Sequence, residues 1–323
     1  MSDDATQGDG GQQPSDGVIG QSVDRLRLWL EGEQANSNSV DVLVDENADL
    51  EKLTELSLGD ASWVFVEESQ ASEAADIGAA LVPYGGRLEP LGGELSLSPE
   101  VLIQTESYAT APYVSVSVPT AFSVVDDVDL SALRTDVEKA QNRGEFPEHL
   151  TLPIATVLDE RSWLSPLLPR RTRATRLLVR ADGSVLDGPF GNPVDSDLTL
   201  TEPTEEPHDD AVAMARFLGA AKVIRALRPR LNATISVAGF GPDADASASE
   251  RTDAVFVAAA EDHQYVVNLE NRRVDRVPTT VAEFVESVFN APDEAVINTE
   301  EQTVLDALGL QATLNTVRER TAQ

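Results

Sequence analysis

The sequence predicts a mixed α and β protein (α/β with α+β character) built from two lobes. The first is a three-layer α/β lobe with a mainly parallel sheet, and the second is an α+β lobe with an antiparallel meander. Strand-like and helix-like segments alternate in the first half of the chain, and this order is typical of a parallel sheet. Short strand-like segments follow one another in the second half, as in a meander. A length of 323 residues also exceeds what a single core usually covers.

The first lobe is expected over residues 18–145. Residues 1–17 precede it as an acidic tail that is rich in Gly, Asp and Gln and has no apolar pattern, which is typical of disorder. Gly144 and Pro147 end the last helical pattern of this lobe together, and we place the boundary between the lobes there. Apolar periodicity predicts the following elements, in order: a helix at 22–31, a strand at 39–44, a helix at 49–56, a strand at 61–66, an Ala-rich helix at 72–82, strands at 87–91, 100–104 and 113–118, and a helix at 130–141.

The second lobe is expected over residues 146–323. Asp182-Gly183 lies between two apolar runs and is a strong hairpin signal. Apolar residues at helical spacing predict a long helix over 209–227, which Pro229 ends. The other expected elements are strands at 152–158, 175–180, 184–186, 234–238, 254–259, 265–269 and 274–277, a helix after Thr279, and a final helix at 300–320.

The composition is strongly acidic. The chain carries 56 acidic and 24 basic side chains, a formal net charge of -32. This resembles cytosolic proteins of haloarchaea, in which molar salt screens the repulsion between like charges. The chain has no cysteine, which excludes disulfides, thiolate nucleophiles and zinc–thiolate sites. Its N-terminus has neither the basic nor the apolar region of a secretory signal, and no run of about 18 apolar residues occurs, so we expect a cytoplasmic protein without a membrane span.

One stretch departs from this acidic composition. Residues 161–180 hold six arginines and no Asp or Glu. Because arginine binds phosphates and carboxylates bidentately, one interpretation is a site for an anion or an acidic partner. The other is that the arginines neutralise the chain's own carboxylates, such as Asp182, Asp187 and the acidic connector at 198–208. Nucleic acid is a disfavoured partner, since high salt weakens binding to the phosphate backbone. The six residues are Arg161, Arg170, Arg171, Arg173, Arg176 and Arg180.

Four carboxylates follow the first two strands of the expected parallel sheet. Asp45 and Glu46 come after the first strand, and Glu67 and Glu68 come after the second. Parallel strands end at the same edge of a sheet, where ligands bind in open α/β folds. These side chains are therefore candidate ligands of a hard cation, with a scaffold role as the alternative. No Gly-rich phosphate loop follows the first strand.

The histidines and serines form no catalytic or metal-binding motif. His149, His208 and His263 are scattered over expected loops without the spacing of a metal site. Neither Gly-x-Ser-x-Gly nor Ser-x-x-Lys occurs in the chain. The sequence therefore specifies no cofactor, and it favours a protein that is not an enzyme.

One short segment resembles an enzyme family. Residues 62–69, SWVFVEES, followed by residues 81–88, LVPYGGRL, look like the late strand, helix and Gly-Gly turn of class I methyltransferases. The resemblance implies a nucleotide-fold transferase that acts at the carboxyl edge of the first sheet. The Gly-rich cofactor loop of that family is absent, and the resemblance carries over no site residue.

These observations favour a non-enzymatic cytosolic binding or interaction protein of a halophilic archaeon, acting alone or as a subunit of a larger assembly, with another protein as its partner. Two alternatives stay open. One is the divergent methyltransferase-like transferase, and the other is a viral or assembly structural protein whose tail becomes ordered on contact. The sequence does not specify an oligomeric state.

Overall fold

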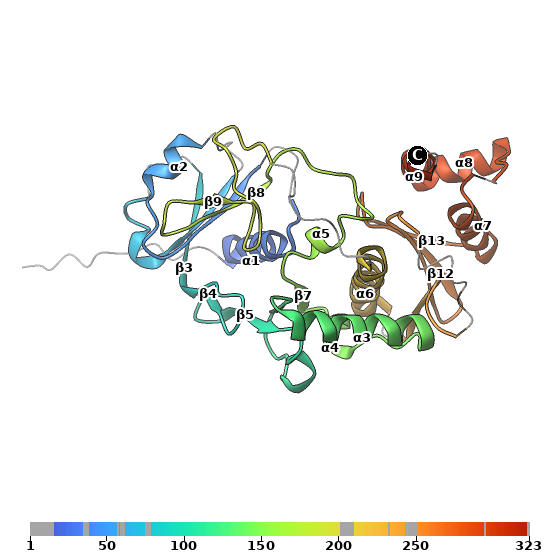
Figure 1. Ribbon diagram of the computed structural model, residues 1–323, viewed down its shortest axis with the longest axis horizontal. Coiled ribbons are helices and arrows are strands. Elements are labelled where there is room, and N and C mark those ends of the chain that lie inside the picture. Colours follow the sequence, from blue (N-terminus) through green and yellow to red (C-terminus); the bar gives the residue numbers. More distant parts are fainter. Residues whose placement is uncertain are drawn as a thin grey trace, which may run out of the picture.

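The computed structural model confirms the fold class. It combines a curled nine-stranded, mostly parallel sheet and its helices with a separate four-stranded antiparallel sheet in the C-terminal part (Figure 1). The structure describes residues 16–34, 39–56, 58, 62–74, 79–200, 210–231, 233–242, 244, 251–293 and 295–321. Of the expected tail, residues 1–15 lie outside this part, whereas Asp16 and Gly17 belong to the first helix, α1 (Asp16–Glu31).

The first sheet has the strand order β7-β6-β5-β4-β3-β2-β1-β8-β9. Strand β4 is antiparallel to both of its neighbours and β9 is antiparallel to β8, whereas the other neighbouring pairs are parallel. The strands are β1 (Asp41–Val44), β2 (Trp63–Glu67), β3 (Ala80–Arg87), β4 (Glu94–Ser98), β5 (Val101–Ser107), β6 (Thr120–Ser123), β7 (Ala155–Val157), β8 (Arg176–Val179) and β9 (Val185–Leu186). The helices in this part are α1, α2 (Glu51–Glu55), α3 (Asp127–Arg143), α4 (Glu148–Thr151) and α5 (Glu160–Trp163).

The central strands are buried on both faces, which explains their uninterrupted apolar runs. Every residue of β1 and of β8 is buried. Leu43 packs in the same cluster as Trp29 of α1 on one face, and Val42 packs in the same cluster as Leu53 of α2 on the other. Trp29 also donates a hydrogen bond from Nε1 to the carbonyl of Leu177 at 3.2 Å. Helices thus cover both faces of these strands, as in a three-layer α/β lobe.

The second sheet runs in chain order, β10-β11-β12-β13, with every neighbouring pair antiparallel. Alternate residues of β11 face opposite cores: Phe256 packs with α6, whereas Val255 and Val257 pack with the three C-terminal helices. The elements are α6 (Ala211–Leu231), β10 (Ile235–Val237), β11 (Val255–Ala260), β12 (His263–Asn268), β13 (Arg273–Val277), α7 (Thr279–Asn290), α8 (Thr299–Leu308) and α9 (Gln311–Thr321).

Helix α6 lies between the two sheets (Figure 1). It packs against α3, α4 and α5 on one side and against β10 and β11 on the other. The division expected at residue 145 stays a prediction, and strands β7, β8 and β9 complete the first sheet from beyond that residue. None of the helices in the described part of the chain combines the length and apolar character required to cross a bilayer.

The expected strand at 87–91 is wrong, and so is the part of the expected helix at 72–82 that the structure describes, while residues 75–78 of that helix lie outside the described part. Ala80 to Arg87 form strand β3, which pairs in parallel with β2, while residues 90–92 form a turn. Pro83 supplies the local reason, because a proline disfavours the helical conformation for the residue before it. Gly85 and Gly86, which the methyltransferase resemblance places in a turn, lie within β3.

The expected strand at 113–118 is also wrong. Residues 111–113 form a 3-10 helix, η2 (Ala111–Tyr113), and the strand that pairs with β5 is β6, residues 120–123. Val114 and Val116 are half-buried and Ser115 is exposed, so burial alternates along this segment as in a strand. The segment nevertheless pairs with no strand among the described residues.

Two helix ends differ from expectation. Helix α6 continues through Pro229 to Leu231, because the fixed φ of proline is itself helical and only one backbone donor near the helix end is lost. The final helix is divided into α8 and α9, since Gly309 adopts a left-handed conformation with φ 68° and caps α8.

Candidate functional site

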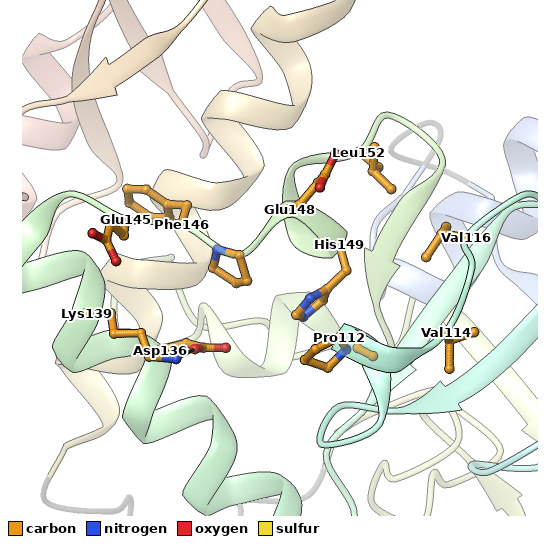
Figure 2. Close-up of a pocket in the computed structure, with 12 residues that line it drawn as sticks. Pro112, Val114, Val116, Asp136, Lys139, Glu145, Phe146, Glu148, His149 and Leu152 are labelled. Atoms are coloured by element: carbon orange, nitrogen blue, oxygen red, sulfur yellow. Dashed lines mark hydrogen bonds and ion pairs between the residues drawn. The ribbon is translucent and has the colours of Figure 1, made fainter.

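A cavity of about 540 Å³ lies between α3, the segment that joins α3 to α4, and η2 (Figure 2). Its volume is in the range of pockets that bind small molecules or side chains. The apolar residues that line it are Ala111, Pro112, Val114, Val116, Phe146, Pro147 and Leu152. The polar ones are Asp136, Lys139, Glu145, Glu148 and His149.

The local sequence fixes the elements that form this cavity. Asp126 caps the N-terminus of α3, because its carboxylate accepts two hydrogen bonds of 2.9 Å from backbone N–H groups of the first turn. Gly144 ends α3 in a left-handed conformation with φ 68°. Pro147 then precedes the short helix α4, which carries His149. The side chain of His149 points from α4 into the space between Asp136 and Pro112 (Figure 2).

His149 is a buried, neutral imidazole. Its residue is only 6% exposed, and burial lowers its pKa to about 4 despite the opposing attraction of Asp136. The ring makes edge-on contacts with Tyr108 and Phe122, with centroids 5.5 and 5.1 Å away. Its Nε2 atom is buried and has no hydrogen-bond partner within the described part of the chain. A buried polar atom of this kind requires an explanation, because native proteins satisfy most such groups.

The carboxylate of Asp136 interacts with two neighbouring side chains, those of Tyr108 and Lys139. Tyr108 donates its hydroxyl hydrogen bond to Oδ2 of Asp136 at 3.2 Å, and Lys139 places Nζ 2.9 Å from Oδ1. Burial, followed by the charge of Asp136, raises the pKa of Tyr108 well above its ordinary value. Tyr108 therefore keeps its proton and fixes Asp136 at the wall of the cavity.

The lowered pKa of His149 limits the proton transfers that this ring can perform. A general base works best with a pKa near the ambient pH, and that of His149 is lowered to about 4. None of the described residues that line the cavity carries a hydroxyl or thiol that such a base would activate. The cavity thus offers a neutral hydrogen-bonding ring together with apolar side chains on one part of its wall and charged side chains on the other.

The structure does not bring the six predicted arginines together in one patch. Arg176 is 3% exposed, pairs with Asp159 and donates to the carbonyl of Trp29 at 2.6 Å. Arg180 donates to the carbonyl of Pro189 at 3.1 Å. The other four also interact with residues of the chain itself. Arg161 and Arg171 lie near Glu33, Arg173 forms a β-bridge with Thr199, and Arg170 has at least one interaction partner.

The four predicted carboxylates lie at the carboxyl ends of the adjacent strands β1 and β2. Arg87 forms an ion pair with Glu46, and Ser69 hydrogen-bonds to Glu67. Burial raises the pKa of Asp45, with the charge of Arg180 opposing it. Glu68 begins a 3-10 turn, η1 (Glu68–Gln70). Among the described residues, no group of three or more His, Asp and Glu side chains is placed to hold a metal ion.

A buried ion cluster was not predicted from the sequence. We define it as Glu31, Glu33, Glu160, Lys222 and Arg225. Lys222 Nζ lies 2.9 Å from Glu160, 3.2 Å from Glu33 and 3.3 Å from Glu31, and Arg225 lies 2.6 Å from Glu160. Burial raises the pKa of Glu31, but the charges of Lys222, Arg225 and a neighbouring arginine lower it to about 2. The available signal was that Lys222 and Arg225 follow Leu218 at helical spacing on the apolar face of α6.

Two of the three histidines lie in regular elements rather than in the expected loops. His149 lies on helix α4 rather than in a loop, whereas His208 lies outside the described residues together with residues 201–207 of the acidic connector. His263 begins strand β12, and its Nδ1 lies 3.3 Å from Arg276.

Comparison of the chain with protein-family models, with curated proteins and with solved structures finds no match in any of the three.

Proposed function

We propose that the chain is a non-enzymatic binding protein whose cavity receives a mainly apolar group with one hydrogen-bonding atom, presented by a partner protein. The observation that supports this most directly is the neutral, buried imidazole of His149, whose Nε2, unpartnered among the described residues, lies in a cavity with seven apolar lining residues. A group that fills the cavity and hydrogen-bonds to this ring gains apolar contact area together with orientation.

The rim of the cavity supports a protein as the partner. The segment 114–118 forms no strand, and its half-buried residues Val114 and Val116 alternate with exposed Ser115 and Ser117. Tyr113, at the same rim, is 89% exposed, which is unusual for a large aromatic side chain. An extended partner segment is able to lie along such a chain and insert a side chain into the pocket beside it.

Phenol tests this function because it combines an apolar ring with one hydroxyl group. We expect phenol to shift the NMR signals of Phe146, His149 and Val116 in the wild-type protein. Val116→Trp, which fills the cavity, is expected to weaken this binding about tenfold or more, and His149→Phe about tenfold, the value of one lost hydrogen bond. Val128→Trp is the matched control, since Val128 is 66% exposed and does not line the cavity. Equal binding by all three variants, or no shifts at all, would reject the cavity as the site.

Under this proposal the protein works in the cytoplasm of a halophilic archaeon. The support is compositional: with a net charge of -32, self-repulsion opposes folding until salt screens it. We expect the melting temperature to rise between 0.1 M and 3 M KCl, by roughly 2 °C for each kcal/mol of repulsion relieved. Circular dichroism measures this, with equimolar sucrose as the control for excluded-volume effects. A melting temperature that stays constant across the KCl series contradicts the halophilic interpretation.

A further inference from the structure

We propose that Arg161, Arg171 and Arg272 form a binding site for a phosphate group, next to Glu33 at the C-terminal end of α1. Arg161 comes from α5 and Arg171 from the segment before β8, whereas Arg272 comes from the turn between β12 and β13. The site therefore joins parts of both sheets, and it is separate from the cavity that contains His149.

Glu33 provides the geometric reference for this site. Its Oε2 atom lies 2.8 Å from Arg272 Nη2 and 3.7 Å from both Arg161 Nη1 and Arg171 Nη2. Its other carboxylate oxygen faces Lys222, whose Nζ is 3.2 Å away. One carboxylate thus has four cations around it, and two of the guanidinium groups are too distant from it to form hydrogen bonds.

Most N–H groups of these three arginines remain available. A guanidinium group has five N–H donors. Among the described residues, Arg161 donates only to the carbonyl of Pro169, at 3.3 Å, and Arg272 donates only to Glu33. Arg171 uses Nη1 for the carbonyl of Gly32 and the hydroxyl of Thr175, both at 2.8 Å, which leaves its other nitrogens. The side chains of Arg161, Arg171 and Arg272 are 17%, 25% and 45% exposed, so each keeps a part of its surface open to solvent.

The guanidinium groups repel one another in the absence of a further anion. Burial, followed by the charge of Arg161, lowers the pKa of Arg171 to about 10. Burial also lowers the pKa of Arg161; Glu33 opposes this shift, and Arg272 adds to it. More distant carboxylates, Glu270 and Asp187, also act on Arg161 without removing its shift. A bound anion would relieve this repulsion, in a chain whose overall charge otherwise repels anions.

Two of the arginines, Arg161 and Arg171, lie close to the residue that follows α1, Gly32. Gly32 adopts φ 74°, and a Cβ atom at this position would lie 3.1 Å from Cβ of Arg161. The glycine lets α1 end close to both arginines and directs its carbonyl oxygen to Arg171. A phosphate group suits three convergent guanidinium forks better than a carboxylate does, because it offers more acceptor oxygens and a second negative charge.

Isothermal titration of the full chain with inorganic phosphate, at constant ionic strength, tests the site. We expect saturable binding by the wild-type protein and binding about tenfold weaker in Arg272→Gln, since a hydrogen bond to a charged group contributes about 1.5–3 kcal/mol. The matched control is Arg273→Gln. Arg273 is the next residue and the first of β13, is similarly exposed at 42%, and pairs with Asp275 at 2.7 Å instead of with Glu33. Circular dichroism verifies that both variants are folded.

Several outcomes would overturn the proposal. They are the absence of phosphate binding by the wild type, equal losses in the two variants, or acetate binding as tightly as phosphate. The acidic connector offers an internal alternative: if phosphate binds only after Glu202, Glu205 and Glu206 are replaced by Gln, the chain's own carboxylates compete for these arginines and the proposed site is wrong. If the site is confirmed, phosphoserine and glycerol phosphate as titrants distinguish a phosphoprotein from a small phosphorylated molecule as the source.

Discussion

Replacing Glu160 by Gln is expected to lower the free energy of unfolding by about 3–5 kcal/mol, the usual result of removing one partner from a buried ion pair. Glu160 is fully buried, and its carboxylate lies 2.6 Å from Arg225 and 2.9 Å from Lys222. The contact with Lys222 is an ion pair without the alignment of a hydrogen bond. The variant leaves two cations of α6 in the interior with one carboxylate fewer, and Gln has almost the same shape, so the loss reports charge rather than packing.

The measurement is urea unfolding in KCl, followed by circular dichroism. Glu55→Gln is the matched control, because Glu55 also pairs with a lysine, Lys52, at 3.1 Å but is 62% exposed. An exposed pair contributes at most about 1 kcal/mol. If both variants lose the same small amount, the buried ion cluster does not stabilise the junction of α1, α5 and α6.

Acidification is expected to destabilise the protein in two separate pH ranges. The pKa of His149 is about 4 in the folded chain and about 6.5 in an unfolded chain, so the unfolded state binds a proton first. Stability from the neutral imidazole is complete above pH 6.5 and is lost as the pH falls to 4, by about 3 kcal/mol in total. Glu31 has a pKa lowered to about 2 from its ordinary value of 4.5, so its contribution is present above pH 4.5 and is lost between pH 4.5 and 2.

Urea unfolding at pH 7, 5 and 4 checks the first of these ranges. His149→Gln cannot take up a proton and is expected to show almost no loss between pH 7 and 5, whereas the wild type loses about 2 kcal/mol. His263→Gln is the control, because His263 lies on β12, away from the cavity, and is expected to keep the wild-type profile. A wild-type curve that is flat between pH 7 and 5 would show that His149 is not held in its neutral form.

The central strands were predictable because their signal is local. The apolar runs of β1 and β8 are each buried on both faces, and such runs need no knowledge of their partners to be recognised. Strand β3 was not predictable in the same way: Leu81 and Val82 acquire their extended conformation by pairing with Val64 and Phe65 of β2, and their Ala-rich neighbourhood favours a helix.

The two candidate sites depend still more on tertiary contacts. Tyr108 lies in the turn after β5, Asp136 on α3 and His149 on α4, and no sequence motif links the three residues. The arginine stretch was visible as a local excess of charge, but Arg272 lies far beyond it, and only the fold brings its side chain to Glu33. Sequence patterns thus identified residues with unusual properties without identifying their neighbours.

The position of β8 has a consequence for synthesis of the chain on the ribosome. Strand β1 is complete early, yet its edge stays open until β8 emerges and pairs with it. Trp29 and its hydrogen-bond acceptor Leu177 are 148 residues apart, an interval of roughly 7–30 s at translation rates of about 5–20 residues per second. During that time the nascent chain presents an unpaired apolar strand edge, the type of surface that self-associates or recruits chaperones.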